Sequence, residues 1–73
     1  MDKKYLHKIL NLMISGKSVK LRKGKYQELK EGNISNYRNY WYIKTIDYEG
    51  NIDLISNFHQ IFSHLDPKEY LEI

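Results

Sequence analysis

The chain has 73 residues, no cysteine and a net charge of +3, with 41 % hydrophobic and 29 % charged residues. A chain of this length forms one domain with a small core, and the lack of cysteine excludes disulfides, zinc ribbons and thiol chemistry. Seven tyrosines, two phenylalanines and one tryptophan are too many aromatic residues for a disordered segment, so we expect residues 1–73 to fold as a single compact domain.

No apolar stretch approaches the ~20 residues that a membrane span needs. Residues 1–15 alternate charged and apolar side chains, unlike the apolar centre of a signal peptide. We therefore expect a protein that neither spans a membrane nor is exported. The lack of cysteine suits a reducing compartment, so the expected location is cytoplasmic.

Residues 3–14 are predicted to form a helix, because their apolar side chains recur every three to four positions on one face. Gly16 is suited to end this helix, since glycine readily adopts the left-handed conformation found after many helices.

Two strands are predicted next. In residues 18–22, Val19 and Leu21 alternate with polar side chains, as in a half-buried strand. A return strand over residues 25–29, with Tyr26 as its aromatic anchor, is expected to follow, and then a turn and a polar loop.

The strongest local pattern predicts a hairpin that pairs residues 40–48 with 51–55, because β-branched and aromatic residues dominate both arms. Asp47 and Gly50 suit the first and last positions of a type I turn followed by a bulge.

This turn sets a register and divides the apolar side chains between two faces. It places Ile46 opposite Ile52, with Tyr42, Ile46, Ile52 and Leu54 on one face and Trp41, Ile43 and Ile55 on the other. A slip of one residue, with Glu49 and Gly50 as the turn, would instead gather Trp41, Ile43, Ile52 and Leu54. In both registers large apolar groups remain on each face, so either helices cover both faces or one face binds a partner, which we favour.

A second helix that begins at Ser56 or Asn57 is predicted from the helical spacing of Phe58, Ile61, Phe62 and Leu65. The order of Asp66, Pro67 and Glu69 is typical of a further helix start. The expected fold is α+β, with an N-terminal helix, an antiparallel sheet of three or four strands centred on the 40–55 hairpin, and a C-terminal helix in one or two segments.

His7, His59 and His64 are the candidates for metal binding or general-base catalysis. On a helix, however, His59 and His64 would lie about 140° apart, which does not suit two ligands of one metal ion. No phosphate-binding glycine loop, nucleophile with its base or pair of facing carboxylates has a recognisable spacing. We expect no metal, no cofactor and no catalytic site.

Positive charge is concentrated at the start of the chain. Residues 1–25 carry eight basic side chains and one acidic one, whereas residues 26–73 carry four basic and eight acidic. Basic residues bind phosphates and aromatic rings stack on bases, a combination suited to single-stranded nucleic acid. The candidate site consists of Lys17, Lys20, Arg22, Lys23, Lys25, Tyr26, Tyr37, Arg38, Tyr40, Trp41 and Tyr42.

The expected function is therefore non-enzymatic binding to single-stranded nucleic acid or to nucleic-acid machinery. This hypothesis requires the cations and the rings to share one exposed surface. Aromatic residues and arginine are also enriched where proteins bind each other, so an acidic protein surface is the alternative partner, and a homo-oligomer is compatible with the sequence.

The abundance of Lys, Ile, Asn and Tyr in a short chain resembles the composition of small mobile-element and phage products. Some of these products, such as anti-CRISPR proteins, inhibit host nucleic-acid enzymes, and the resemblance implies such an inhibitor as the alternative function. A small ribonuclease toxin is the second alternative, because Lys, Arg, His and Tyr can all serve in acid-base catalysis.

Overall fold

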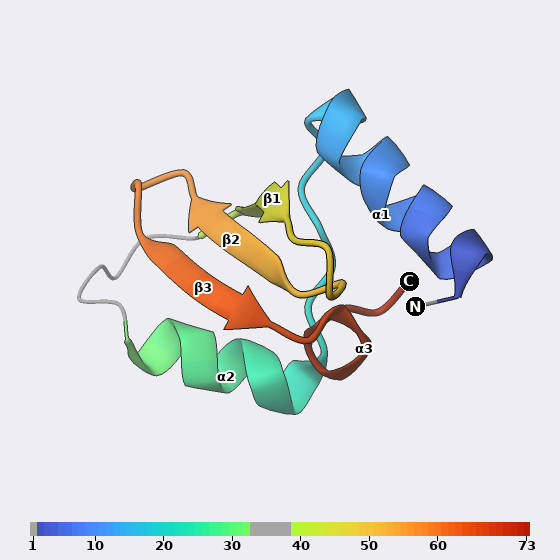
Figure 1. Cartoon of the computed structure of the whole chain (residues 1–73). Coiled ribbons are helices and arrows are strands. Elements are labelled where there is room, and N and C mark those ends of the chain that lie inside the picture. Colours follow the sequence, from blue (N-terminus) through green and yellow to red (C-terminus); the bar gives the residue numbers. More distant parts are fainter. Residues whose placement is uncertain (1, 33–38) are drawn as a thin grey trace.

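A computed structural model describes residues 2–32 and 39–73 of the chain. It confirms the α+β fold: an N-terminal helix, a three-stranded antiparallel sheet in the order β1-β2-β3, and a short C-terminal helix (Figure 1). The elements in chain order are α1 (Lys3–Ser15), α2 (Lys23–Glu31), β1 (Trp41–Ile46), β2 (Ile52–Ser56), β3 (Ile61–Leu65) and α3 (Pro67–Tyr70).

The first helix begins and ends with the chemistry that its sequence predicts. The Asp2 side chain accepts a hydrogen bond of 2.9 Å from the backbone N–H of Lys4, which caps the start. Gly16 follows the last turn with a φ of 67°, and its N–H donates to the carbonyl of Met13. Only glycine reaches this conformation without steric cost, so the helix ends at Gly16.

Residues 23–31 form the helix α2, and the return strand predicted over residues 25–29 is wrong. The segment consists mainly of good helix formers, and Tyr26 and Leu29 lie three positions apart on the side that faces the core. The strand prediction rested on a single aromatic residue, which fits a helix equally well.

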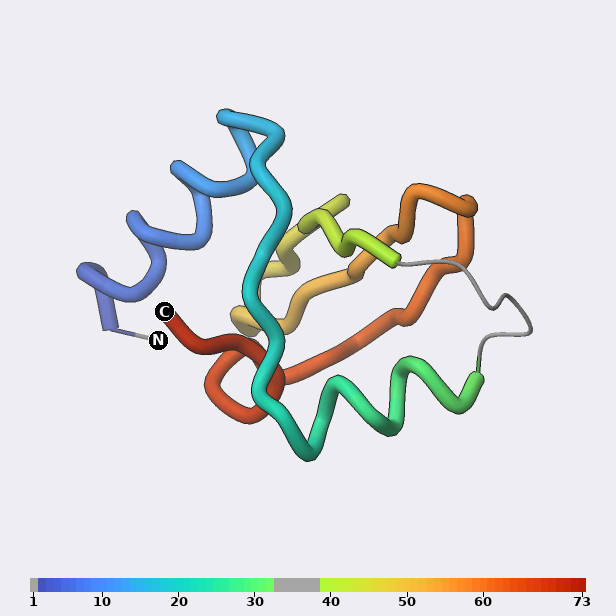
Figure 2. Tube along the Cα trace, turned by 180° about the vertical axis from the view of Figure 1, so that it is seen from behind, coloured from blue at the N-terminus to red at the C-terminus, as the bar shows by residue number. Residues whose placement is uncertain are grey.

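Residues 17–22 connect α1 to α2 as an extended segment, which we call the connecting segment (Figure 2). Its side chains alternate as predicted, with Val19 buried and Lys20 exposed, but it is not a strand of the sheet. On one edge of the segment, the Val19 N–H donates a hydrogen bond of 2.8 Å to the Trp41 carbonyl. The other edge forms an isolated antiparallel bridge between Leu21 and Leu71.

The β1–β2 hairpin has the predicted turn and the predicted first pair. The Gly50 N–H donates to the Asp47 carbonyl at 3.1 Å, and Ile46 lies opposite Ile52.

The predicted division of its side chains is wrong, however, because the register shifts between Ile43 and Thr45. One extra residue in β1 turns every side chain before it to the other face of the sheet. The buried face therefore gathers Trp41, Ile43, Ile52 and Leu54, the set that the slipped register would have produced.

Residues 61–65 form the strand β3, and the helix predicted from Ser56 or Asn57 onward is wrong. The Ser56 hydroxyl accepts hydrogen bonds from the N–H groups of Phe58 and Gln60, which closes a turn between β2 and β3. His59 in this turn has a φ of 65°, which a right-handed helix excludes.

A second register shift explains why the sequence of β3 imitates a helix. Phe62 lies opposite Leu54 and Leu65 lies opposite Ile52, with the irregularity between them. Both Phe62 and Leu65 thus reach the core although they are three positions apart, a spacing typical of a helix face.

The core lies on one face of the sheet, where both long helices and the connecting segment pack (Figures 1 and 2). Its buried members are Ile9, Val19, Leu29, Trp41, Ile43, Ile52, Leu54 and Leu71. The opposite face of the sheet carries the row formed by Tyr42, Ile55 and Ile61, and the pair Thr45 and Asp53. We call it the open face. Helices of the described residues pack on the core face, and the binding of a partner to the open face stays a prediction.

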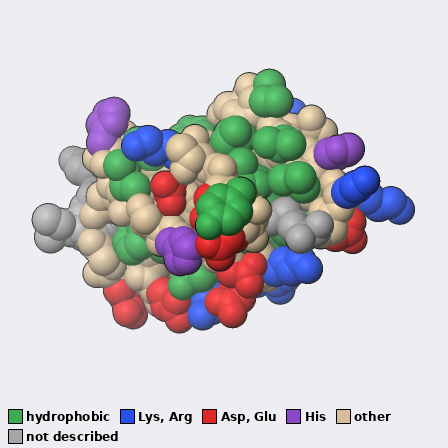
Figure 3. All heavy atoms as spheres, viewed as in Figure 1, with side chains coloured by type: hydrophobic (Ala, Val, Ile, Leu, Met, Phe, Trp, Pro, Cys, Tyr) green, Lys and Arg blue, Asp and Glu red, His purple; other side chains and the backbone are tan. Residues whose placement is uncertain are grey.

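The short helix α3 begins as its sequence predicts. Asp66 accepts a hydrogen bond of 3.0 Å from the Lys68 N–H, and Pro67 occupies the first turn. In Figure 3, acidic side chains gather along the lower edge of the molecule and basic ones at the right-hand side.

Shortening an isoleucine on the core face should cost more stability than the same change on the open face. Ile52 is fully buried, whereas Ile55 in the same strand is half-buried. We expect Ile52→Val to lower the free energy of unfolding by about 0.5–1.5 kcal/mol, and Ile55→Val by less than half as much. Urea denaturation of both variants measures this, and equal losses would contradict the assignment of the two faces.

Candidate nucleic-acid interface

A cleft of about 370 Å³ opens between the connecting segment and the start of β1. Its lining consists of Ser18, Val19, Lys20, Leu21, Tyr26, Asn39, Tyr40 and Trp41. We call it the tyrosine cleft. Four residues of the predicted site line it together, namely Lys20, Tyr26, Tyr40 and Trp41.

The cleft exists because two stretches of backbone meet at one point and then separate. Within the described residues, the Val19–Trp41 hydrogen bond is the only backbone bond between the connecting segment and β1. The other edge of the segment is held by the C-terminal residues, through Arg22 N–H to the Tyr70 carbonyl at 2.9 Å and Glu72 N–H to the Lys20 carbonyl at 3.0 Å. These bonds fix the segment as one wall of the cleft.

The two tyrosines reach the cleft from different elements. Tyr26 is half-buried on α2, and Tyr40, just before β1, is 42 % exposed. The backbone of Tyr40 is fixed by Asn57, which accepts from the Tyr40 N–H at 2.9 Å and donates its own N–H to the Tyr40 carbonyl at 3.1 Å. These two bonds fix the backbone of Tyr40 to the turn between β2 and β3, and the Tyr40 ring is partly exposed.

The other two rings of the described part of the predicted site are not exposed rings of the cleft. Trp41 is only 2 % exposed and packs edge-on against Phe62, with ring centroids 5.3 Å apart. The prediction that Trp41 offers an exposed ring is wrong, because Trp41 is a core residue. Tyr42 lies on the open face and does not line the cleft, so its part in binding stays a prediction. Alternation along β1 sends neighbouring side chains to opposite faces, so the two rings could not share one surface.

Lys20 is the cation that lines the cleft. Its Nζ lies 3.2 Å from the Glu72 carboxylate, and both side chains are well exposed. An exposed pair of this kind contributes little to stability, so a phosphate group could replace Glu72 at small cost. Lys23 is exposed in the first turn of α2, one residue beyond Arg22.

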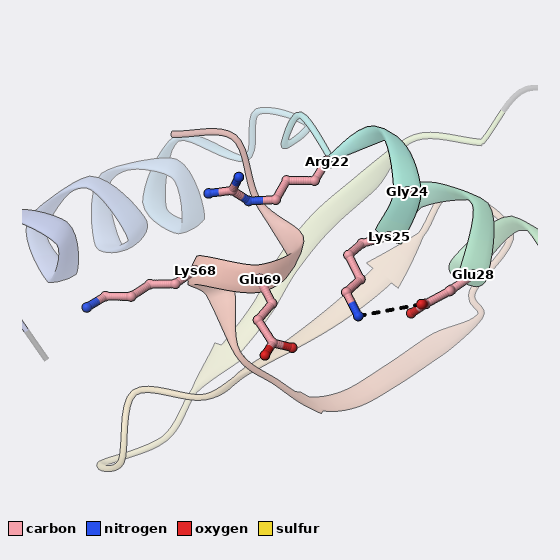
Figure 4. A pocket seen from close by; sticks show the side chains of 6 residues that line it. All are labelled: Arg22, Gly24, Lys25, Glu28, Lys68 and Glu69. Carbon is pink, nitrogen blue, oxygen red and sulfur yellow. Dashed lines mark hydrogen bonds and ion pairs between the residues drawn. The ribbon is translucent and has the colours of Figure 1, made fainter.

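Arg22 and Lys25 line a different cavity, of about 620 Å³, together with Gly24, Glu28, Lys68 and Glu69 (Figure 4). The Lys25 Nζ lies 3.5 Å from the Glu28 carboxylate and 5.2 Å from the centroid of the Tyr70 ring. Figure 4 shows Arg22 and Lys68 extending to one side, away from this pair. Three cations and two carboxylates line this cavity, and no ring of the predicted site is among its lining residues.

The remaining residues of the predicted site are not brought to the cleft. Lys17 lines a third cavity, with Lys8 and Ile73. Tyr37 and Arg38 lie outside the described residues, so their place in the site stays a prediction.

Asn39 lines the cleft and was missed by sequence reasoning. A single asparagine before a strand is typical of an ordinary loop, so no signal in the sequence distinguishes it. Its Oδ1 is buried and has no hydrogen-bond partner in the described part of the chain. An unsatisfied buried acceptor costs about 1–3 kcal/mol, which makes this amide unusual in a folded protein.

The histidines do not form a metal site in the residues that the structure describes, where no three His, Cys, Asp or Glu side chains gather. His64 lies in β3 with a φ of 61°, and its Nδ1 is 3.6 Å from the Asp47 carboxylate. Across residues 2–32 and 39–73, no helix is long and apolar enough to cross a membrane.

No protein-family model, curated protein or solved structure matches this chain.

A polar group on the open face gives a pH-dependent contribution to stability. Asp53 accepts hydrogen bonds from the His64 N–H at 3.0 Å and the Thr45 hydroxyl at 2.8 Å, and these bonds lower the pKa of Asp53. A lowered pKa in the folded state adds stability above the ordinary aspartate value of about 3.9, and this stability is lost as the pH falls through the folded-state pKa.

We therefore expect Asp53→Asn to destabilise the protein at neutral pH, and the difference from the unsubstituted protein to shrink as the pH falls below about 4. Urea denaturation at a series of pH values measures this. Glu49→Gln, in the exposed hairpin turn, is the control and should show no such trend. A difference that stays constant with pH would show that the carboxylate charge plays no part.

Proposed function

We propose that this protein binds single-stranded nucleic acid at the tyrosine cleft and does not act as an enzyme. The observation that carries the proposal is the meeting of Lys20, Tyr26 and Tyr40 in one cleft, although they come from three separate parts of the chain. Arg22 and Lys23 continue the positive charge from Lys20 along the same stretch of backbone.

The proposed binding mode follows from the chemistry of each group. The backbone of the nucleic acid runs along the connecting segment, with phosphates near Lys20, Arg22 and Lys23. One unstacked base enters the cleft and stacks on the exposed ring of Tyr40, with Tyr26 beside it. A duplex keeps its base faces covered by neighbouring bases, so the cleft favours single strands.

Removing the three cations should weaken binding and reduce its dependence on salt. Three phosphate contacts on a single strand give a slope of about −2 in a plot of log affinity against log salt. We expect the Lys20→Ala, Arg22→Ala, Lys23→Ala triple variant to lose most of this slope. Fluorescence anisotropy with labelled mixed-sequence DNA and RNA, over about 50–200 mM salt, measures it.

Two controls separate a local site from a general attraction. The Lys3→Ala, Lys4→Ala, Lys8→Ala variant loses the same charge from exposed positions on α1 and should keep the slope. Glu72→Gln removes the carboxylate that pairs with Lys20, so affinity should rise. Equal losses in both triple variants would argue against a site at the connecting segment, and the absence of any binding at low salt would overturn the proposal.

Removing the Tyr40 ring should cost about 1–3 kcal/mol of binding free energy, as for other base-stacking rings. Tyr40→Ala is therefore expected to bind about 5- to 150-fold more weakly in the same assay, whereas Tyr40→Phe keeps the ring and most of the affinity.

Tyr48, in the hairpin turn, is the matched control, because it is 98 % exposed and does not line the cleft. Tyr48→Ala should leave the affinity unchanged. If Tyr40→Ala binds as tightly as Tyr48→Ala, stacking in the cleft is excluded.

A protein partner is the second candidate, and the open face favours it. Ile61 is 49 % exposed on this face, and Phe58, in the turn before β3, is 43 % exposed. An inhibitor of a nucleic-acid enzyme could dock through these side chains. A protein that binds neither DNA nor RNA at low salt would favour this candidate. The labelled RNA in the same assay should stay intact, and its cleavage would instead indicate a ribonuclease.

A further inference from the structure

The amide of Asn39 is an unusual polar group of the tyrosine cleft. Its Oδ1 is buried without a hydrogen-bond partner in the described residues, although Asn39 lines an open cavity. Buried acceptors are almost always paired in folded proteins, so an unpaired one beside a cavity suggests a donor that arrives with a ligand.

Two other buried polar atoms lack partners in the same part of the chain, but contacts hold their side chains in place. Trp41 also lines the cleft, and its Nε1 belongs to a ring that is held in the core against Phe62. Gln60 is anchored at its amide nitrogen, which donates to the Gly32 carbonyl at 3.1 Å. Contacts thus hold the Trp41 and Gln60 side chains in place, whereas no side-chain hydrogen bond holds the Asn39 amide within the described residues.

An asparagine amide offers one acceptor and a pair of donors side by side. Adenine presents the complement on one edge, with its N6 amino group as donor and N7 as acceptor, and this is the bidentate pairing that asparagine makes with bases. Uracil, thymine and cytosine can also pair with an amide along one edge, through N3–H or the N4 amino group and a neighbouring acceptor, but each offers a smaller ring to stack.

We infer that the tyrosine cleft selects adenine, with the base stacked on Tyr40 and paired through N6 and N7 with the amide of Asn39. This inference rests on the proposed function, since it specifies the base that the proposed site accepts. Because Oδ1 is covered in the free protein, the amide must turn into the cleft as the base enters. The last torsion of an asparagine side chain is broad, so this rotation needs no backbone movement.

The test compares oligoadenylate, oligouridylate and oligocytidylate of equal length, and the corresponding DNA strands, in the anisotropy assay. A bidentate pair discriminates by about 5- to 150-fold, so the wild-type protein should favour adenine by that factor. The DNA and RNA series distinguish the two sources of the base, and a preference in either one supports the inference.

Asn39→Leu removes both polar ends of the amide at similar size. It should abolish the preference for adenine and leave the salt slope unchanged, because the phosphate contacts remain. Asn11→Leu, on the exposed surface of α1, is the matched control and should keep the preference.

A second readout does not depend on nucleic acid. Since Asn39→Leu replaces an unsatisfied buried acceptor by an apolar group, it should not lower the melting temperature of the free protein.

Each failure has a distinct meaning. Equal affinity for all bases overturns the selection of adenine but leaves the proposed function standing. A preference that survives in Asn39→Leu overturns the role of Asn39. A protein that binds none of the strands overturns the proposed function, and this inference with it.

Discussion

The connecting segment holds two parts of the protein together, and the candidate site depends on it. Residues 17–22 bond on one edge to β1, through Val19, and on the other edge to the C-terminal residues, through Lys20 and Arg22. The cleft receives Tyr40 from just before β1 and Tyr26 from α2, the helix that follows the segment. In the part of the chain that the structure describes, the segment has only one backbone bond to β1, and the tyrosine cleft opens between the two.

The features that sequence predicts correctly are those whose chemistry is contained in a few adjacent residues. Gly16 ends α1, Asp47 and Gly50 make the hairpin turn, and Asp66 with Pro67 begins α3. In each case a side chain or a glycine satisfies backbone groups two to four positions away, so no distant contact is needed to decide the structure.

The features that sequence misses depend on irregular pairing between strands. A bulge in β1 moves Trp41 from a predicted surface into the core, and another between β2 and β3 gives Phe62 and Leu65 the spacing of a helix. Neither bulge has a clear residue signature. The site was predicted only in part for the same reason: the sequence indicates which residues are cationic or aromatic, but the register decides which of them meet.

The left-handed backbones of His59 and His64 lie before β3 and near its end, and β3 is an edge of the sheet. A strand edge normally offers a regular row of N–H and C=O groups to another chain. One such bend, at His64, interrupts the row on this strand of only five residues, and the other, at His59, lies just before it. This limits growth of the sheet at that side, which protects a small protein with apolar side chains on its open face from edge-to-edge aggregation.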